Sequence, residues 1–131
     1  MMNDECRMMN EKPQDIGIRT KAFALRIIRL YTALPKSTEA QVIGKQVLRS
    51  GTSVGAHVRE GKRSRSDAEL VSKIEGGLQE LEETVYWLEL LVDSGIVKAD
   101  KIAELMKEAD ELIAILVSGA KTVKIRKNKN D

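Results

Sequence analysis

Apolar residues recur along much of the chain at spacings of three and four positions, which is the period of one face of an α-helix. The first run consists of Phe23, Ile27, Leu30 and Leu34. It predicts a helix over residues 18–33. The helix should end at Leu34-Pro35, because a residue that precedes proline is pushed out of the helical conformation.

A second run consists of Ile43, Val47, Val54 and Val58. It predicts a helix from Thr38 to about Gly61, and Thr38 with Gln41 has the spacing of a capping box. The residues that follow, 62–65, form a basic turn.

The third run is the longest and consists of Val71, Ile74, Leu78, Leu81, Val85, Leu88 and Val92. Ser66 and Glu69 form a capping box before it, and Ser94-Gly95 is a typical helix stop. Together with Val85, the further apolar residues Leu70, Leu90 and Leu91 widen this face. The wide face is either a broad core face or a subunit interface.

The fourth run consists of Ile102, Leu105, Ala109, Leu112 and Leu116. It predicts a helix from Lys98 or Ala99 that frays after Gly119. Four amphipathic helices joined by short turns predict an all-α fold, an antiparallel up-down-up-down four-helix bundle. We therefore divide the chain into a disordered N-terminal tail (1–17), a bundle domain (18–120) and a basic C-terminal tail (121–131).

The amino-acid composition excludes several kinds of fold and of functional site. The 131 residues suit one domain, and aromatic residues make up only 3%, which argues against an all-β fold. A single cysteine, Cys6, permits no intrachain disulfide, and with a single histidine it excludes most His/Cys metal sites. No cofactor is expected. Because no secretory signal or membrane-length apolar run is present, we expect a cytoplasmic protein without a membrane partner.

The net charge of +2 conceals a strong segregation of charge. Residues 19–65 carry a net +9, residues 66–120 a net −9, and residues 121–131 a net +4. In one interpretation the basic helices pack against the acidic ones, within or between subunits. In the other, part of the basic half faces outward and binds a polyanion.

The segment 50–61, SGTSVGAHVREG, is rich in small residues although it lies inside the predicted second helix. Gly51 and Gly55 share one face, which indicates the close approach of another helix, and Gly76-Gly77 could be the complementary surface. We interpret the segment as a helix-packing motif rather than a ligand site. Its members are Gly51, Gly55, His57, Glu60 and Gly61. For His57, a hydrogen bond in a helix interface is the simpler interpretation, against a pH-sensing or catalytic role.

The same segment, with several flanking residues, resembles a bacterial four-helix-bundle family that includes proteins encoded in intervening sequences of large-subunit ribosomal RNA genes. The residues that carry the resemblance are Pro35, Glu39, Gly44-Lys45-Gln46, Leu48-Arg49-Ser50, the SVGAHVREG stretch, Arg65, Ser66, Glu69, Gly77-Leu78 and Glu80-Leu81. The family usually has Asn in the place of His57.

The resemblance implies an antiparallel bundle that assembles into a ring-shaped homopentamer. It also implies kinship with the accessory variability protein of diversity-generating retroelements, a basic pentamer that binds nucleic acid and a reverse transcriptase. For the intervening-sequence proteins themselves, the resemblance brings no established activity.

These observations favour a non-enzymatic homo-oligomer that binds RNA or DNA through its phosphates. The candidate contacts are Lys45, Arg49, Arg59, Lys62, Arg63, Arg65, Lys121, Lys124, Arg126, Lys127 and Lys129. Alternatively, Arg49 and Arg59 bond to acids of a neighbouring helix, and the protein is an interaction scaffold that binds no nucleic acid. An enzyme is not expected, because the chain has no phosphate loop, no G-x-S-x-G elbow and no pair of Glu-x-x-His motifs.

Overall fold

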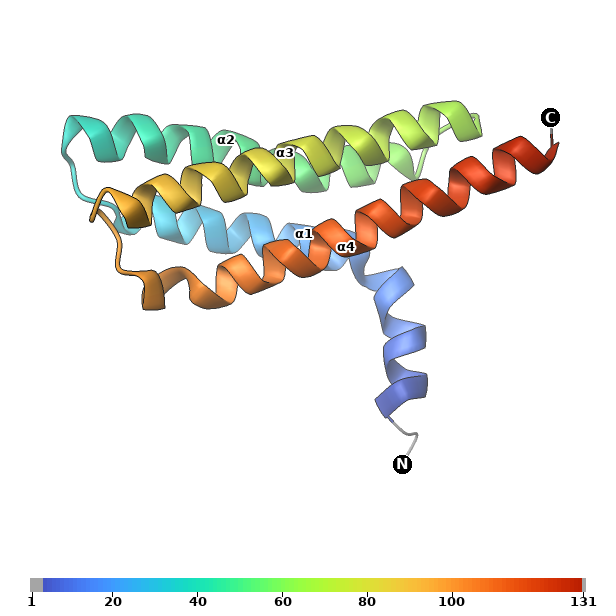
Figure 1. Cartoon of the computed structure of the whole chain (residues 1–131), viewed down its shortest axis with the longest axis horizontal. Coiled ribbons are helices and arrows are strands. Elements are labelled where there is room, and N and C mark those ends of the chain that lie inside the picture. Colours follow the sequence, from blue (N-terminus) through green and yellow to red (C-terminus); the bar gives the residue numbers. More distant parts are fainter. Residues whose placement is uncertain (1–3, 131) are drawn as a thin grey trace.

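The computed structural model describes residues 4–130, and side chains from residue 16 to residue 129. Its four helices are α1 (Asp4–Ala33), α2 (Thr38–Gly61), α3 (Asp67–Asp93) and α4 (Ala99–Asn130). Each helix runs antiparallel to the one before it (Figure 1), and α1–α2, α2–α3 and α3–α4 pack side by side. α1 and α4 also meet, over fewer residues. This arrangement confirms the predicted up-down-up-down four-helix bundle.

Two helices are longer than the apolar spacing predicted. α1 begins at Asp4 rather than near Ile18, so helical backbone covers residues for which we predicted a disordered tail. α4 does not fray after Gly119 but continues to Asn130, because Ala120 and Val123 prolong its buried face. Both predicted helix limits were therefore wrong. The division of the chain into 1–17, 18–120 and 121–131 stays a prediction.

The start of α2 differs from the prediction by one residue. Ser37, not Thr38, is the N-cap: its backbone is extended, and its hydroxyl accepts a hydrogen bond from Ala40 N at 3.3 Å. Gln41 does not complete a capping box. Its amide nitrogen donates to the Pro35 carbonyl, and its amide oxygen accepts from the Tyr31 hydroxyl. Gln41 thus ties the first turn of α2 to the end of α1.

The ends of α3 follow the predicted residues. The Ser66 hydroxyl accepts from Glu69 N at 3.1 Å, and the Glu69 carboxylate accepts in return from Arg65 N at 3.1 Å. After the helix, Gly95 has a φ of +79°, a left-handed conformation that glycine adopts without strain. The short turns on either side of α3 are therefore fixed by local chemistry.

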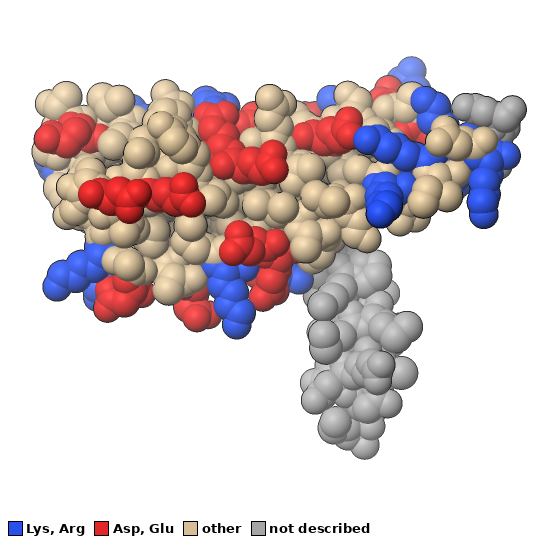
Figure 2. All heavy atoms as spheres, viewed as in Figure 1, with Lys and Arg blue, Asp and Glu red and all other residues tan. Residues whose placement is uncertain are grey.

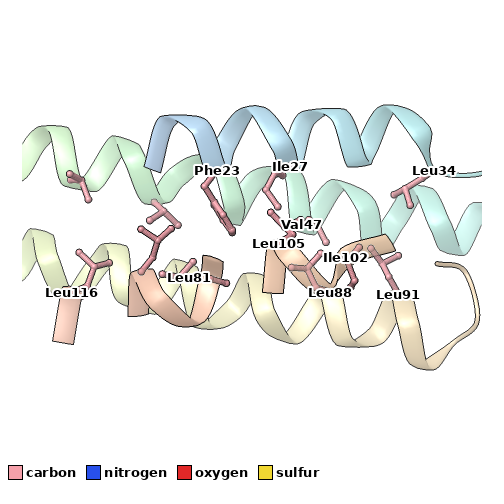
Figure 3. Packing of buried hydrophobic residues seen from close by; sticks show 14 residues of the cluster. Phe23, Ile27, Leu34, Val47, Leu81, Leu88, Leu91, Ile102, Leu105 and Leu116 are labelled. Atoms are coloured by element: carbon pink, nitrogen blue, oxygen red, sulfur yellow. The ribbon is translucent and has the colours of Figure 1, made fainter. Parts of the chain in front are cut away.

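One continuous apolar core fills the bundle (Figure 3). α1 contributes Phe23 and Ile27, both fully buried, and α2 contributes Val47 and Val54. The predicted face of α4 is buried throughout, from Ile102 to Leu116. Because these residues come from helices far apart in sequence, burial of this core holds the bundle together.

The buried seam of α3 shares only Leu81 and Leu88 with the run that the apolar spacing predicted. The fully enclosed positions are Gly77, Leu81, Thr84, Leu88 and Leu91. The predicted Val71, Ile74, Leu78, Val85 and Val92 are only half-buried. A glycine and a threonine interrupt the true seam, so hydropathy alone hides it. Of the residues that widen this face, Leu91 is fully buried and Val85 packs against the core, whereas Leu70 and Leu90 are half-buried outside it. Only part of the wide face therefore serves the core of its own subunit.

Glycines let α1 lie very close to α2. A Cβ on Gly51 would stand 2.8 Å from Ile27 Cγ1, and one on Gly44 would stand 2.6 Å from Leu34 Cδ1. At Gly55 it would lie 3.3 Å from the Thr20 hydroxyl. Gly44, Gly51 and Gly55 therefore face α1. They do not face the Gly76-Gly77 pair, which the sequence suggested as their complement.

Candidate nucleic-acid interface

Cations from two distant parts of the chain meet at one end of the bundle. The turn between α2 and α3 lies beside the last turns of α4 (Figure 1). Figure 2 shows Lys and Arg gathered at this end, whereas Asp and Glu spread over the rest of the same face. We call this cluster the basic end. Its members are Lys62, Arg63, Arg65, Lys121, Lys124, Arg126 and Lys127, and all of them are exposed.

Two of the α4 cations are paired with acids of α3. The Arg126 guanidinium makes a two-pronged hydrogen bond to Asp67, with Nη2 2.7 Å from one carboxylate oxygen and Nε 3.2 Å from the other. This contact holds the pKa of Asp67 below its usual range. Lys124 Nζ lies 2.7 Å from Glu75. Both pairs are exposed to solvent, where such contacts are weak and salt-sensitive.

The other members of the basic end have no acidic partner among the side chains that the structure describes: Lys62, Arg63, Arg65, Lys121 and Lys127. Part of this charge has a local explanation, because cations in the last turn of α4, including Lys127 and Lys129, favourably face the negative end of the helix dipole. The same explanation covers Lys62 and Arg63, which lie at the C-terminus of α2, but not Arg65, which lies just before the N-terminus of α3.

A hollow of about 510 Å³ opens at the basic end between α2, α3 and α4. Its walls are mainly aliphatic and include Val58, Leu70 and Ile74, while Lys62, Arg65 and Arg126 stand around it together with Asp67. The hydroxyl of Ser64 is buried here without a hydrogen-bond partner among the described residues. The basic end is thus a concave surface rather than a flat patch.

Two predicted contacts, Lys45 and Arg49, lie away from this cluster, whereas Arg59 stands one helical turn before Lys62. Lys45 is about 25 Å from Lys62 along α2, at 1.5 Å per residue. Arg49 bonds to Glu80 at 3.3 Å and to Glu83, which raises the pKa of its guanidinium. Arg59 faces the groove between α1 and α2. The alternative that the sequence left open, an ion pair with acids of a neighbouring helix, is therefore correct for Arg49.

His57 belongs to the contact between α2 and α3. Its ring covers Gly76, where a Cβ would come within 2.9 Å of it. Its Nε2 lies 3.9 Å from a carboxylate oxygen of Glu80, and its Nδ1 is buried without a hydrogen-bond partner among the described side chains. The ring is thus held mainly by packing on a glycine.

The remaining motif residues also pack between these helices. Glu60 accepts a hydrogen bond from Lys73 at 3.0 Å, which lowers the pKa of its carboxyl group. Gly61 lies against the Leu70 side chain. Gly61, His57 and Glu60 therefore join α2 to α3, while Gly51 and Gly55 join α2 to α1.

The described residues contain neither a cluster of metal-ligating side chains nor a helix that could span a membrane. No three His, Cys, Asp or Glu side chains come together there in a way that could hold a metal ion. No helix among them combines the length and apolar character needed to cross a bilayer. Cys6, which the sequence placed in a mobile tail, lies outside the described side chains.

Sequence reasoning missed the partner of Arg126. Asp67 stands 59 positions earlier in the chain, at the first residue of α3. The available signal was topological: in an antiparallel bundle, α3 begins where α4 ends. Asp67 lies in the first turn of α3, where an acidic side chain interacts favourably with the helix dipole. The antiparallel order of the helices places this side chain beside the cations at the end of α4.

The chain is similar to a known protein family and to solved structures. The model of the 23S rRNA-intervening sequence protein family matches residues 14–118. The chain is also similar to a crystal structure of a protein of unknown function from the S23 ribosomal protein family of Bacteroides thetaiotaomicron VPI-5482. The two chains are 35% identical with a TM-score of 0.77, over 81% of this chain and 98% of that one. No curated protein matches.

Proposed function

This chain belongs to the 23S rRNA-intervening sequence protein family, and from that premise we propose that it is a non-enzymatic, homo-oligomeric protein that binds the phosphate backbone of RNA or DNA through its basic end. The observation that carries the proposal is the convergence of the α2–α3 turn with the C-terminal turns of α4. Two clusters of cations about 60 residues apart in sequence form one surface, which requires this fold.

The pairs within the basic end are compatible with phosphate binding. Arg126 and Lys124 meet Asp67 and Glu75 at exposed positions, so either cation can exchange a carboxylate for a phosphate at little cost. A planar guanidinium suits a phosphate as well as it suits a carboxylate. Binding of this kind follows backbone charge and shape, because no described aromatic side chain lies at the basic end to stack on a base.

An apolar stripe on α1 supports self-association. Ile18, Leu25 and Ile28 are 69%, 45% and 42% exposed and lie on one face of the helix. Exposed large apolar side chains gathered on one face are typical of protein interfaces. We place the subunit interface on this face of α1, rather than on α3 as the sequence suggested.

The alternative is a scaffold that binds only proteins. It is favoured by the ion pairs that connect the basic and acidic halves of the chain, Arg49 with Glu80 and Glu83 and Arg19 with Glu108. Such pairs use basic residues inside the subunit. They leave the basic end itself largely unpaired, which is why we prefer nucleic-acid binding.

The test is fluorescence anisotropy with a labelled RNA hairpin and a labelled DNA duplex over a series of salt concentrations. We expect the affinity to fall steeply with salt, since each phosphate neutralised adds about 0.9 to the slope for duplex DNA. The triple variant Lys62→Glu, Arg63→Glu, Arg65→Glu should bind weakly and with a shallower slope.

A matched control reverses three exposed cations outside the basic end: Lys36→Glu, Lys45→Glu and Lys107→Glu. It changes the net charge by the same amount, so it separates a local surface from a global charge effect. Equal losses in the two variants, or no binding at low salt, would favour the scaffold. Light scattering on the Leu25→Glu, Ile28→Glu variant checks the interface, which should dissociate.

A further inference from the structure

A second concave surface lies at the opposite end of the bundle, where α4 begins beside the last turns of α1 (Figure 1). It is a groove of about 720 Å³ between α1 and the segment that joins α3 to α4. Buried and half-buried aliphatic side chains form its floor: Leu30, Leu34, Ile96, Val97, Ile102 and Leu105. The groove exists because α1 and α4 meet over fewer residues than the other neighbouring helices.

Both walls of this groove carry cations and neither carries an acid. Arg26 and Arg29 stand on the α1 side, and Lys98 and Lys101 stand on the α4 side. No Asp or Glu lines the groove. Among the described side chains, none of these four cations forms an ion pair. Elsewhere on the molecule, ion pairs with acidic side chains are formed by Arg19, Arg49, Lys73 and Arg126.

We propose that this groove binds an amphipathic helix of a partner protein, with an apolar stripe facing the floor and acidic residues along both flanks. A helix that packs into the seam between two others buries one stripe of side chains, and its flanking positions meet the residues of the walls. Apolar floor and basic walls are the complement of apolar stripe and acidic flanks. A nucleic acid would match the walls but would leave the aliphatic floor without a partner.

A second copy of this chain is a poorer occupant. Its acidic helix, α3, exposes Glu75, Glu82, Glu89 and Asp93 on the outside of the bundle. The same helix has only one large apolar side chain that is strongly exposed, Tyr86 at 52%. Such a face can meet the cations of the groove but cannot fill its floor.

The probe is a labelled three-heptad peptide with Leu at the a and d positions and Glu at e and g. A control peptide has Lys in place of Glu. Like charges at e and g keep each peptide from pairing with itself. Fluorescence anisotropy with the full-length protein should show binding of the acidic peptide and at least tenfold weaker binding of the basic one. Photo-crosslinking from the peptide should label α1 and the start of α4.

Charge reversal on both walls gives the sharpest result. The variant Arg29→Glu, Lys101→Glu should lose the acidic peptide and gain the basic one, an exchange of preference that a misfolded protein cannot produce. The matched control Lys21→Glu, Lys107→Glu reverses two exposed cations outside the groove and should keep the original preference. Ala33→Glu, which adds a negative charge to the lining of the groove, should weaken binding of the acidic peptide.

Three results would overturn the proposal. One is equal binding of the two peptides, or crosslinks outside the groove. Another is a change of oligomeric state in the Arg29→Glu, Lys101→Glu variant, which would assign the groove to a second copy. The third is a selective loss of RNA or DNA binding in that variant. Because the basic end lies at the other end of the bundle, failure of nucleic-acid binding there leaves the groove proposal standing, and the reverse also holds.

Discussion

The hydroxyl oxygen of Thr84 lies 2.8 Å from that of Ser50, and both side chains are fully buried between α2 and α3. Ser50 donates its own proton to the Gln46 carbonyl at 2.9 Å, so its oxygen acts as an acceptor for Thr84. The Glu80 carbonyl stands at the same distance of 2.8 Å from Thr84 and shares that proton. A polar link of this kind fixes the register of two helices in a core that is otherwise apolar.

Replacing Thr84 with Val keeps the shape of the side chain and removes the hydroxyl. We expect the free energy of unfolding to fall by about 1 kcal/mol, since the oxygen of Ser50 loses its donor while Ser50 still bonds to Gln46. Urea unfolding followed by circular dichroism measures the change. With Ser50→Ala added, the total loss should be smaller than the sum of the single losses. Strict additivity would mean that the two hydroxyls are energetically independent.

Gly51 tests the close approach of α1 and α2. Ala at this position gains about 1 kcal/mol of helix propensity. Its Cβ, however, would stand 2.8 and 3.0 Å from the two γ carbons of Ile27, a buried β-branched side chain that cannot easily move. We expect a net loss of about 1 kcal/mol or more in the free energy of unfolding.

Gly119 provides the matched control, because a Cβ there would meet nothing closer than Ile74 Cδ1 at 4.0 Å. Gly119→Ala should raise the free energy of unfolding by about 0.5–1 kcal/mol. Thermal unfolding of both variants gives the comparison. A stabilised Gly51→Ala protein would show that the two helices are not in tight contact at this point.

Glu83 makes part of the stability depend on pH. Its carboxylate accepts a hydrogen bond from Trp87 Nε1 at 3.0 Å and pairs with Arg49, and these two contacts hold its pKa below the usual glutamate range. A carboxyl group whose pKa is lower in the folded state stabilises the fold fully above its unfolded pKa of about 4.3. That stability is lost as the pH falls through the lower folded value.

Trp87 is the only tryptophan, so its fluorescence reports on this carboxylate directly. We expect its emission to titrate with an apparent pKa below the ordinary glutamate value. The Glu83→Gln variant should lack this titration, and its stability should depend less on pH in the acid range. Equal acid sensitivity of the two proteins would rule out a contribution from Glu83.

Arg19 links α1 to α4, which of all neighbouring helices make the smallest contact. It makes a two-pronged contact with Glu108, at 2.7 and 3.0 Å, and a further one with Glu111 at 2.8 Å. The side chains of Arg19 and Glu108 are only 19% and 20% exposed. We expect Arg19→Gln to lower the free energy of unfolding by about 1–2 kcal/mol, because a half-buried carboxylate is left without its cation.

The comparison for this prediction is Arg126→Gln, which breaks a pair of similar geometry at an exposed site. No measurable change in stability is expected there, because solvent and salt screen the contact. Chemical unfolding of both variants under the same conditions distinguishes the two sites. Equal effects would mean that the burial of Arg19 contributes nothing.

The sequence by itself determined the number, order and type of the helices. Alternation of apolar positions at three and four residues is a local property, and the Ser66–Glu69 box, Pro35 and Gly95 act on their immediate neighbours. These signals need no knowledge of the rest of the chain. The same applies to the buried face of α4, whose members are all apolar.

Only the tertiary structure decided which residues meet. The seam of α3 includes Gly77 and Thr84, which become core positions because His57 and Val54 cover one and Ser50 bonds to the other. Neither residue is apolar enough to be recognised from hydropathy. Likewise, Asp67 and Arg126 become partners through the antiparallel order of α3 and α4.

The two candidate surfaces show the same division. Counting charges revealed a basic half of the chain, but it could not tell Arg49, paired across α2 and α3, from Arg63 and Arg65 at the basic end. It also gave no sign that Arg29 and Lys101 border one groove. Charge is a property of single residues, whereas a surface is made by packing, which brings together positions that the chain keeps far apart.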